Sequence, residues 1–238
     1  MDKISKFDGI DYIKSYASKI STMHELIKTL LQDHVCDGDI IIDIGGGPGM
    51  GARIIDDLGK KAVVINIEPS TTIYDVPRLS TVEYIPLRMS IKEALDAQMP
   101  YTPDCLLMVS SAHEIALCNN AQASENKRLF FQDLNIFIKK NLKPNGTIII
   151  GFPNYYKGAT QSEIDRQRKL TESIFGHSHP SNEFFLLEEF SVALGMQPVV
   201  HIQSPMNIAP SSSQKTVLMA NGAVFNNIEA VQQLTNHH

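Results

Sequence analysis

Two places in the chain carry side chains that could do chemistry. His113 and Glu114 follow an apolar run at 105–109. A histidine can take a proton from a hydroxyl, carboxyl or amine near neutral pH, and a neighbouring carboxylate can orient it. Asp43 is followed by five glycines within residues 45–51. A carboxylate beside bare glycine backbone suits a ligand with a cationic group, because such a ligand can approach the main chain closely.

The elements around Asp43 form a strand, a turn and a helix. Residues 40–44 are mostly β-branched and apolar, which predicts a buried strand of a parallel sheet. The glycines then allow the positive φ that a tight turn needs. From Ala52 to Leu58 the apolar residues recur at helical spacing. The first N–H groups of this helix are therefore available to a polar or anionic group.

Two interpretations of the glycine-rich turn compete. Residues 47–52 fit the dinucleotide fingerprint G-x-G-x-x-A, a match that is weakly specific by itself. Asp43 and the run Gly45-Gly46-Gly47-Pro48-Gly49 also resemble, without a gap, the acidic-x-Gly-x-Gly-x-Gly loop with which class I methyltransferases bind S-adenosylmethionine (SAM). A carboxylate near a pyrophosphate would repel it, whereas the amino group of SAM is cationic. Asp43 therefore favours the methyltransferase interpretation.

The order of the other elements predicts an α/β fold. Strands are expected at 61–68, 81–85, 105–109, 147–150, 196–202 and 216–220, and helices at 126–142, 162–175 and 187–194. A loop without a helix joins the last two strands, so the last strand should insert antiparallel. We predict three α/β/α layers around a seven-stranded, mostly parallel sheet, with N-terminal helices and a helical insertion after strand five. The resemblance to class I methyltransferases covers about residues 37–220.

The predicted organisation has three parts. An N-terminal helical cap spans 1–36, and a Rossmann-like domain spans 37–221 and contains a substrate-side insertion at 152–186. A polar tail at 222–238 is expected to form a loose helix.

The resemblance implies a cofactor site built from several strand ends. Glu68 follows the glycines by about 20 residues, the offset at which a carboxylate can bind two ribose hydroxyls. Met89 stands where the family often has Asp or Asn at the adenine. It could pack on the adenine with its amide meeting a ring nitrogen, or it could be a core residue. The predicted cofactor-binding residues are Asp43, Gly45, Gly46, Gly47, Gly49, Glu68, Met89, Ser110 and Ser111.

The predicted catalytic and substrate residues surround that site. If the strand at 105–109 neighbours the glycine-rich strand, His113 and Glu114 leave the sheet beside the reactive end of the cofactor. His113 is the predicted general base, and Glu114 would orient it or contact substrate. The candidate substrate contacts are Tyr12, Tyr16, Tyr155, Tyr156, His177 and His179. The His-x-His pair could also bind a metal with His113 and Glu114, an interpretation we rank below substrate contact, and no metal is predicted.

Composition limits the partners. The 238 residues are 43% hydrophobic, enough for the core of one α/β domain. The formal net charge is −5, with acidic and basic residues mixed along the chain, which argues against a nucleic-acid partner. No apolar run approaches the ~20 residues that span a bilayer, so no membrane partner is predicted. Cys36, Cys105 and Cys118 have unrelated spacings, which favours reduced thiols and a cytoplasmic location.

These inferences predict a methyltransferase that uses SAM and yields S-adenosylhomocysteine (SAH). No nucleic-acid signature is present, so the expected acceptor is a small molecule that offers a hydroxyl or carboxyl oxygen, or else a nitrogen. The alternatives are a protein that binds SAM or SAH without methyl transfer, a protein methyltransferase and an NAD-dependent oxidoreductase. The oligomeric state is open, with a homodimer as one option.

Overall fold

The computed structural model describes residues 10–74, 76, 78–109, 111–112, 115, 123–175, 186–206 and 217–226. Within these ranges, the side chains of 10–21, 72, 123–124 and 171–175 are outside the description. The elements, in chain order, are α1 (Ile10–His34), β1 (Ile40–Ile44), α2 (Met50–Asp57), β2 (Ala62–Ile67), the 3-10 turn η1 (Thr71–Tyr74), β3 (Val82–Leu87), α3 (Ile91–Asp96), β4 (Cys105–Val109), α5 (Ala123–Asn141), β5 (Thr147–Tyr155), α6 (Gln161–Phe175), α7 (Leu187–Leu194), β6 (Val200–Pro205) and β7 (Leu218–Asn226).

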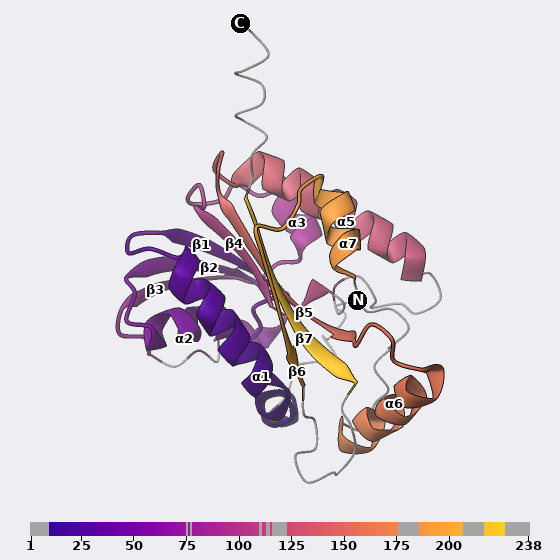
Figure 1. Ribbon diagram of the computed structural model, residues 1–238. Coiled ribbons are helices and arrows are strands. Elements are labelled where there is room, and N and C mark those ends of the chain that lie inside the picture. Colours follow the sequence, from indigo (N-terminus) through magenta and orange to yellow (C-terminus); the bar gives the residue numbers. More distant parts are fainter. Residues whose placement is uncertain are drawn as a thin grey trace, which may run out of the picture.

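The strands form one seven-stranded sheet in the order β3-β2-β1-β4-β5-β7-β6 (Figure 1). The strands β1 to β5 run parallel, and β7 inserts antiparallel between β5 and β6. Both the number of strands and the antiparallel last strand confirm the predicted fold. The order reverses between β1 and β4, which are direct neighbours.

Helices cover both faces of the sheet and complete the three predicted layers (Figure 1). Because successive side chains on a strand point to opposite faces, β4 contributes to two cores. Leu106 and Met108 pack with α3, α5 and α7, whereas Leu107 and Val109 pack with α1 and α2. The strand β4, which is buried on both faces, therefore has apolar residues at every position.

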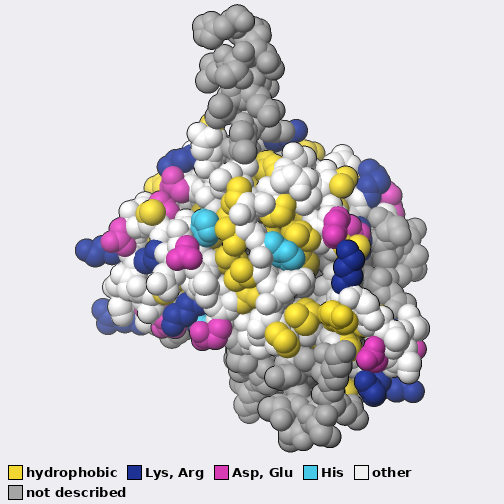
Figure 2. Space-filling view, in the orientation of Figure 1, with side chains coloured by type: hydrophobic (Ala, Val, Ile, Leu, Met, Phe, Trp, Pro, Cys, Tyr) yellow, Lys and Arg dark blue, Asp and Glu magenta, His cyan; other side chains and the backbone are white. Residues whose placement is uncertain are grey.

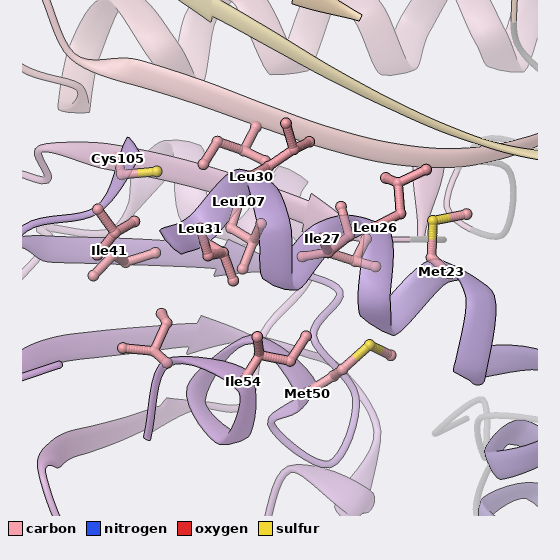
Figure 3. Packing of buried hydrophobic residues seen from close by; sticks show 14 of the residues in the cluster. Met23, Leu26, Ile27, Leu30, Leu31, Ile41, Met50, Ile54, Cys105 and Leu107 are labelled. Carbon is pink, nitrogen blue, oxygen red and sulfur yellow. The ribbon is translucent and has the colours of Figure 1, made fainter. Parts of the chain in front are cut away.

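The long helix α1 lies close against β5 and β7 because two glycines face it. Gly151 and Gly222 are partners across the β5–β7 ladder. A Cβ on Gly151 would come within 2.7 Å of Ile27, and one on Gly222 within 2.2 Å of Leu26. Figure 3 shows the side chains of α1, including Leu26, Ile27 and Leu30, gathered in this apolar layer.

Two strands are longer than the sequence predicts. We expected β5 to end near residue 150, but it continues to Tyr155 through pairs with β7. Pairing with β4 stops at Gly151, so Pro153 has a strand neighbour on one side only and its missing N–H leaves no ladder position empty there. The prediction for β7 was also wrong. It runs to Asn226 rather than ending near 220, because it pairs with β5 as far as Thr147.

Other boundaries shift by a few residues. The predicted strand at 196–202 is β6 at Val200–Pro205, and the predicted strand at 81–85 is β3 at Val82–Leu87. The expected loose helix after 221 is strand as far as Asn226, and residues 227–238 lie outside the described residues.

The surface carries mixed charges. On the face shown in Figure 2, basic and acidic side chains lie interspersed around a central band of hydrophobic side chains. Among the described helices, none combines the length and the apolar character needed to cross a membrane.

Candidate functional site

The candidate site lies at the carboxyl ends of the strands, where the strand order reverses between β1 and β4. In open α/β sheets, ligands bind in the crevice at such a point. The strands β1 and β4 are neighbours, with Asp43 in register with Leu107, so the condition stated in the sequence analysis is met. Three predicted segments therefore meet at this edge: the glycine-rich loop after β1, Glu68 after β2 and the segment after β4.

The glycine-rich loop bends as expected through positive φ. Gly45, Gly47 and Gly49 have φ of 69°, 52° and 73°, which side chains rarely adopt. A Cβ placed on Gly47 would meet nothing within 4 Å, so the backbone at this residue is open to a ligand. The helix α2 then begins at Met50, and no side chain caps its first turn.

Glu68 is joined to the glycine-rich loop. The N–H of Gly47 donates to Glu68 Oε2 at 3.1 Å, and the N–H of Ser70 donates to Oε1 at 2.8 Å. The carboxylate is half-buried. It is thus held at the end of β2, facing the loop, as the sequence offset predicts.

Asp43 is enclosed beneath the loop. Its residue exposure is 1%, and neither carboxylate oxygen has a hydrogen-bond partner of standard geometry among the described residues. A Cβ on Gly46 or Gly51 would come within 2.6 Å of Asp43 Oδ2, so only glycine fits above the carboxylate. Burial raises the pKa of Asp43 to about 7, the nearby N–H of Gly51 lowers it by less, and the charge of Glu68 raises it further.

A second buried polar side chain accompanies Asp43. Asn66 on β2 is fully buried and is the register partner of Asp43. Its Nδ2 donates to the carbonyl of Gly47 at 3.0 Å and to the hydroxyl of Tyr84 at 2.7 Å. The Tyr84 hydroxyl in turn donates to the carbonyl of Ile73 at 3.1 Å.

The segment after β4 begins against the loop. The Ser111 hydroxyl donates to the carbonyl of Ile44 at 2.7 Å, and a Cβ on Gly45 would come within 2.5 Å of Ser111. Ser111 is buried, and its hydrogen bond links the segment after β4 to the end of β1. The predicted base His113, together with Glu114 and Ser110, lies outside the described residues.

Met89 lies at the carboxyl end of β3. Its side chain is half-buried against the core on the side of α3 and α5. Its N–H donates to the carbonyl of Leu87 at 2.8 Å, so this amide already has an acceptor. Packing, rather than an amide contact, is what Met89 can offer to a ligand.

The substrate-side candidates are placed in part. Tyr155 ends β5, half-buried against the core beneath α1, and Tyr156 follows it and is exposed. Met23 of α1 lies against Gly151, the partner of Val109 at the end of β4. The turns of α1 before Met23, at about 1.5 Å per residue, therefore extend past this edge of the sheet. They carry Tyr12 and Tyr16, whose side chains, like His177 and His179, lie outside the described part.

The polar groups of this site suit a ligand that is an organic cation and carries hydroxyl groups. The loop offers open backbone at Gly47, and the end of β2 offers a carboxylate. Asp43 and Asn66 add buried acceptor oxygens that have no hydrogen-bond partner of standard geometry within the described ranges. Among the described residues, no group of three His, Cys, Asp or Glu side chains could hold a metal ion.

Solved structures share the fold of this chain. A SAM-dependent methyltransferase from Geobacter sulfurreducens, in complex with SAH, matches with a TM-score of 0.54 at 11% identity, over 92% of this chain and 98% of that chain. One from Anabaena variabilis matches with a TM-score of 0.54 at 14% identity, over 87% and 85%. The mycolic acid cyclopropane synthase CmaA1, complexed with SAH and CTAB, matches with a TM-score of 0.55 at 12% identity, over 85% and 83%.

The chain has the class I methyltransferase fold. No family model and no curated protein sequence matches it.

Within this class I methyltransferase fold, sequence reasoning missed Asn66 and Tyr84. The sequence does mark Asn66 as a candidate site residue, because it is a polar residue inside an apolar strand, two residues before Glu68. The sequence does not mark Tyr84 in this way, because aromatic residues are common in strands.

Proposed function

We propose that the protein is a SAM-dependent methyltransferase that moves a methyl group to an oxygen (hydroxyl or carboxyl) or a nitrogen of a small molecule. The observation that carries this proposal is the hydrogen bond from the Gly47 N–H to Glu68, at 3.1 Å. It joins the two segments that would hold the two ends of the cofactor, at the point where the strand order reverses. The solved neighbours add support, since two of them hold SAH.

Three groups of this chain would hold the cofactor. Glu68 would accept the ribose hydroxyls, and the open backbone around Gly47 would lie along the methionine portion. Asp43 would act through its charge, because its oxygens are enclosed beneath Gly46 and Gly51. In the low dielectric of a buried site, a carboxylate attracts a cation strongly even across one layer of backbone.

The residues after β4 would supply the proton chemistry. SAM brings a methyl group that is already activated on a sulfonium, so alignment of the acceptor is the main task of the protein. When bound, SAM would supply the methyl group and leave as SAH, the electron pair of the C–S bond going to sulfur as the acceptor oxygen bonds to the methyl carbon. His113 would take the proton of the acceptor, and Glu114 would orient its imidazole.

The acceptor would approach from the edge where α1 and the end of β5 lie. Tyr155 and Tyr156, and Tyr12 and Tyr16 on α1, are the proposed contacts. One neighbour, CmaA1, is named as a mycolic acid cyclopropane synthase, which is compatible with a small-molecule acceptor. On the face shown in Figure 2, acidic and basic side chains are interspersed, and the formal net charge is −5, which supports a small molecule over nucleic acid as the acceptor.

Calorimetric binding of SAM, SAH and NADH tests the cofactor. We expect micromolar binding of SAM and SAH, lost in Asp43→Ala and retained in Asp57→Asn, a control on the exposed end of α2. Binding of NADH in place of both sulfur nucleosides would overturn the proposed function and leave the fold intact. Binding of none of the three would also overturn it.

A further inference from the structure

The glycine-rich loop is held from below by one buried amide. Asn66 donates both to the carbonyl of Gly47, at 3.0 Å, and to the hydroxyl of Tyr84, at 2.7 Å. The hydroxyl of Tyr84 in turn donates a hydrogen bond to the carbonyl of Ile73 in η1, at 3.1 Å. Two side chains therefore connect the loop after β1 with β2, β3 and the turn after Glu68.

Glu68 belongs to the same hydrogen-bond network as Asn66 and Tyr84. Gly47 is bound through its carbonyl to Asn66 and through its N–H to Glu68. Glu68 also accepts from the N–H of Ser70, which lies just before η1, and η1 is bound to Tyr84. The direction of the Gly47 peptide and the position of the Glu68 carboxylate are thus fixed by the same set of hydrogen bonds.

Packing alone does not explain a buried amide at residue 66. A buried polar group costs free energy unless its hydrogen bonds are satisfied, and among the residues that the structure describes Asn66 Oδ1 has no partner of standard geometry. An apolar residue would fill this strand position at a lower cost. What the amide adds is the pair of donor contacts to Gly47 and Tyr84.

The loop needs such support because of its glycines. Glycine populates positive φ and negative φ almost equally, so three positive-φ glycines within five residues leave the free loop many conformations. The ring of Tyr84 also lies beneath the loop, since a Cβ on Gly49 would come within 3.3 Å of Tyr84 Cε2. Burial raises the pKa of the Tyr84 hydroxyl, so it remains a neutral donor at physiological pH.

We propose that Asn66 and Tyr84 are positioning residues, which hold the glycine-rich loop and Glu68 in the arrangement that binds the cofactor. The identity of that cofactor rests on the proposed function. The ordering of the loop does not, and it can be measured without any ligand.

Tyr84→Phe tests this proposal with the loss of a single hydroxyl. The matched control is Tyr101→Phe, an exposed tyrosine before the amino end of β4, at the opposite edge of the sheet. Hydrogen exchange of the ligand-free proteins reports on residues 44–51, and calorimetry gives the Kd for SAH. Because breaking a buried hydrogen bond leaves Asn66 without one of its acceptors, we expect roughly tenfold faster exchange in the loop and roughly tenfold weaker SAH binding in Tyr84→Phe alone.

A purely structural role would give a different result. Tyr84→Phe would then lower the melting temperature but leave the exchange of residues 44–51 and the Kd at wild-type values, which would overturn the proposal. Faster exchange with an unchanged Kd would also overturn it, since the loop would be ordered without positioning the ligand. Absence of SAH binding by the unsubstituted protein would overturn the proposed function, and the exchange comparison would still decide whether Tyr84 orders the loop.

Discussion

Asp43 and Asn66 lie opposite each other on β1 and β2, and a Cβ on Gly46 would come within 2.8 Å of a side-chain oxygen of each. Both are buried, and none of these oxygens has a hydrogen-bond partner of standard geometry in the described part of the chain. Two acceptor groups thus face the same glycine. The site should respond to protons and to cations, because either would relieve the buried negative charge.

We predict that Asp43 makes the ligand-free protein less stable as pH rises. Burial raises the pKa of Asp43 from 3.8 to about 7, so between these values the folded protein keeps a proton that the unfolded chain has lost. The free energy of unfolding should fall through this window, by at most roughly 4 kcal/mol, and level off above it. Denaturant titrations from pH 4 to pH 8 measure this effect. Asp43→Asn should abolish the slope and Asp57→Asn should keep it; equal slopes in the two variants would refute the assignment.

We predict that Glu68→Gln weakens cofactor binding without unfolding the loop. A glutamine has one acceptor oxygen, which can still accept from the Gly47 N–H, whereas the Ser70 N–H loses its acceptor and the charge that strengthens hydrogen bonds to ribose hydroxyls is lost. The Kd for SAH should rise roughly tenfold or more. Calorimetry provides the value, with Glu83→Gln on the exposed side of β3 as the control. An unchanged Kd would place the ribose elsewhere.

We predict that His113→Ala lowers turnover and spares cofactor binding. General-base catalysis contributes about 10²–10⁴-fold, so kcat with a responsive acceptor should fall by an amount in this range. The Kd for SAM should remain close to the wild-type value. His201→Ala, which changes an exposed residue of β6, is the control. Unchanged turnover would remove His113 as the base and leave the cofactor assignment in place.

We predict that Gly222→Ala destabilises the packing of α1. The added Cβ would lie 2.2 Å from Leu26 Cδ2 and 2.8 Å from Leu30 Cδ1, an overpacking that typically costs about 1–3 kcal/mol. Chemical denaturation measures the loss. Combining it with Leu26→Ala, which vacates the space, should cost less than the sum of the two single changes. Strict additivity would show that the contact does not limit the packing.

Local sequence determined the central unit of this protein. The residue types at 40–57 predict the local structure without help from the rest of the chain: a β-branched strand, glycines at the residues that take positive φ, and an amphipathic helix. The offset of Glu68 and the absence of a helix between the last two strands followed from the same local patterns. These features depend on residues that are close in sequence, so the order of residue types was enough to predict where they occur.

Only the tertiary structure decided which distant residues meet. Asn66 contacts Gly47 and Tyr84, each 18 or more positions away, and no local pattern records such a pairing. The extension of β5 to Tyr155 depends on a β7 that lies more than 60 residues later, and the need for glycine at residue 222 is visible only once α1 is packed over it. The enclosure of Asp43, which sets its raised pKa, likewise results from Gly46 and Gly51 closing over it. Burial and long-range hydrogen bonds depend on the assembled sheet, which is why the chemistry of the loop was visible in the sequence and its support was not.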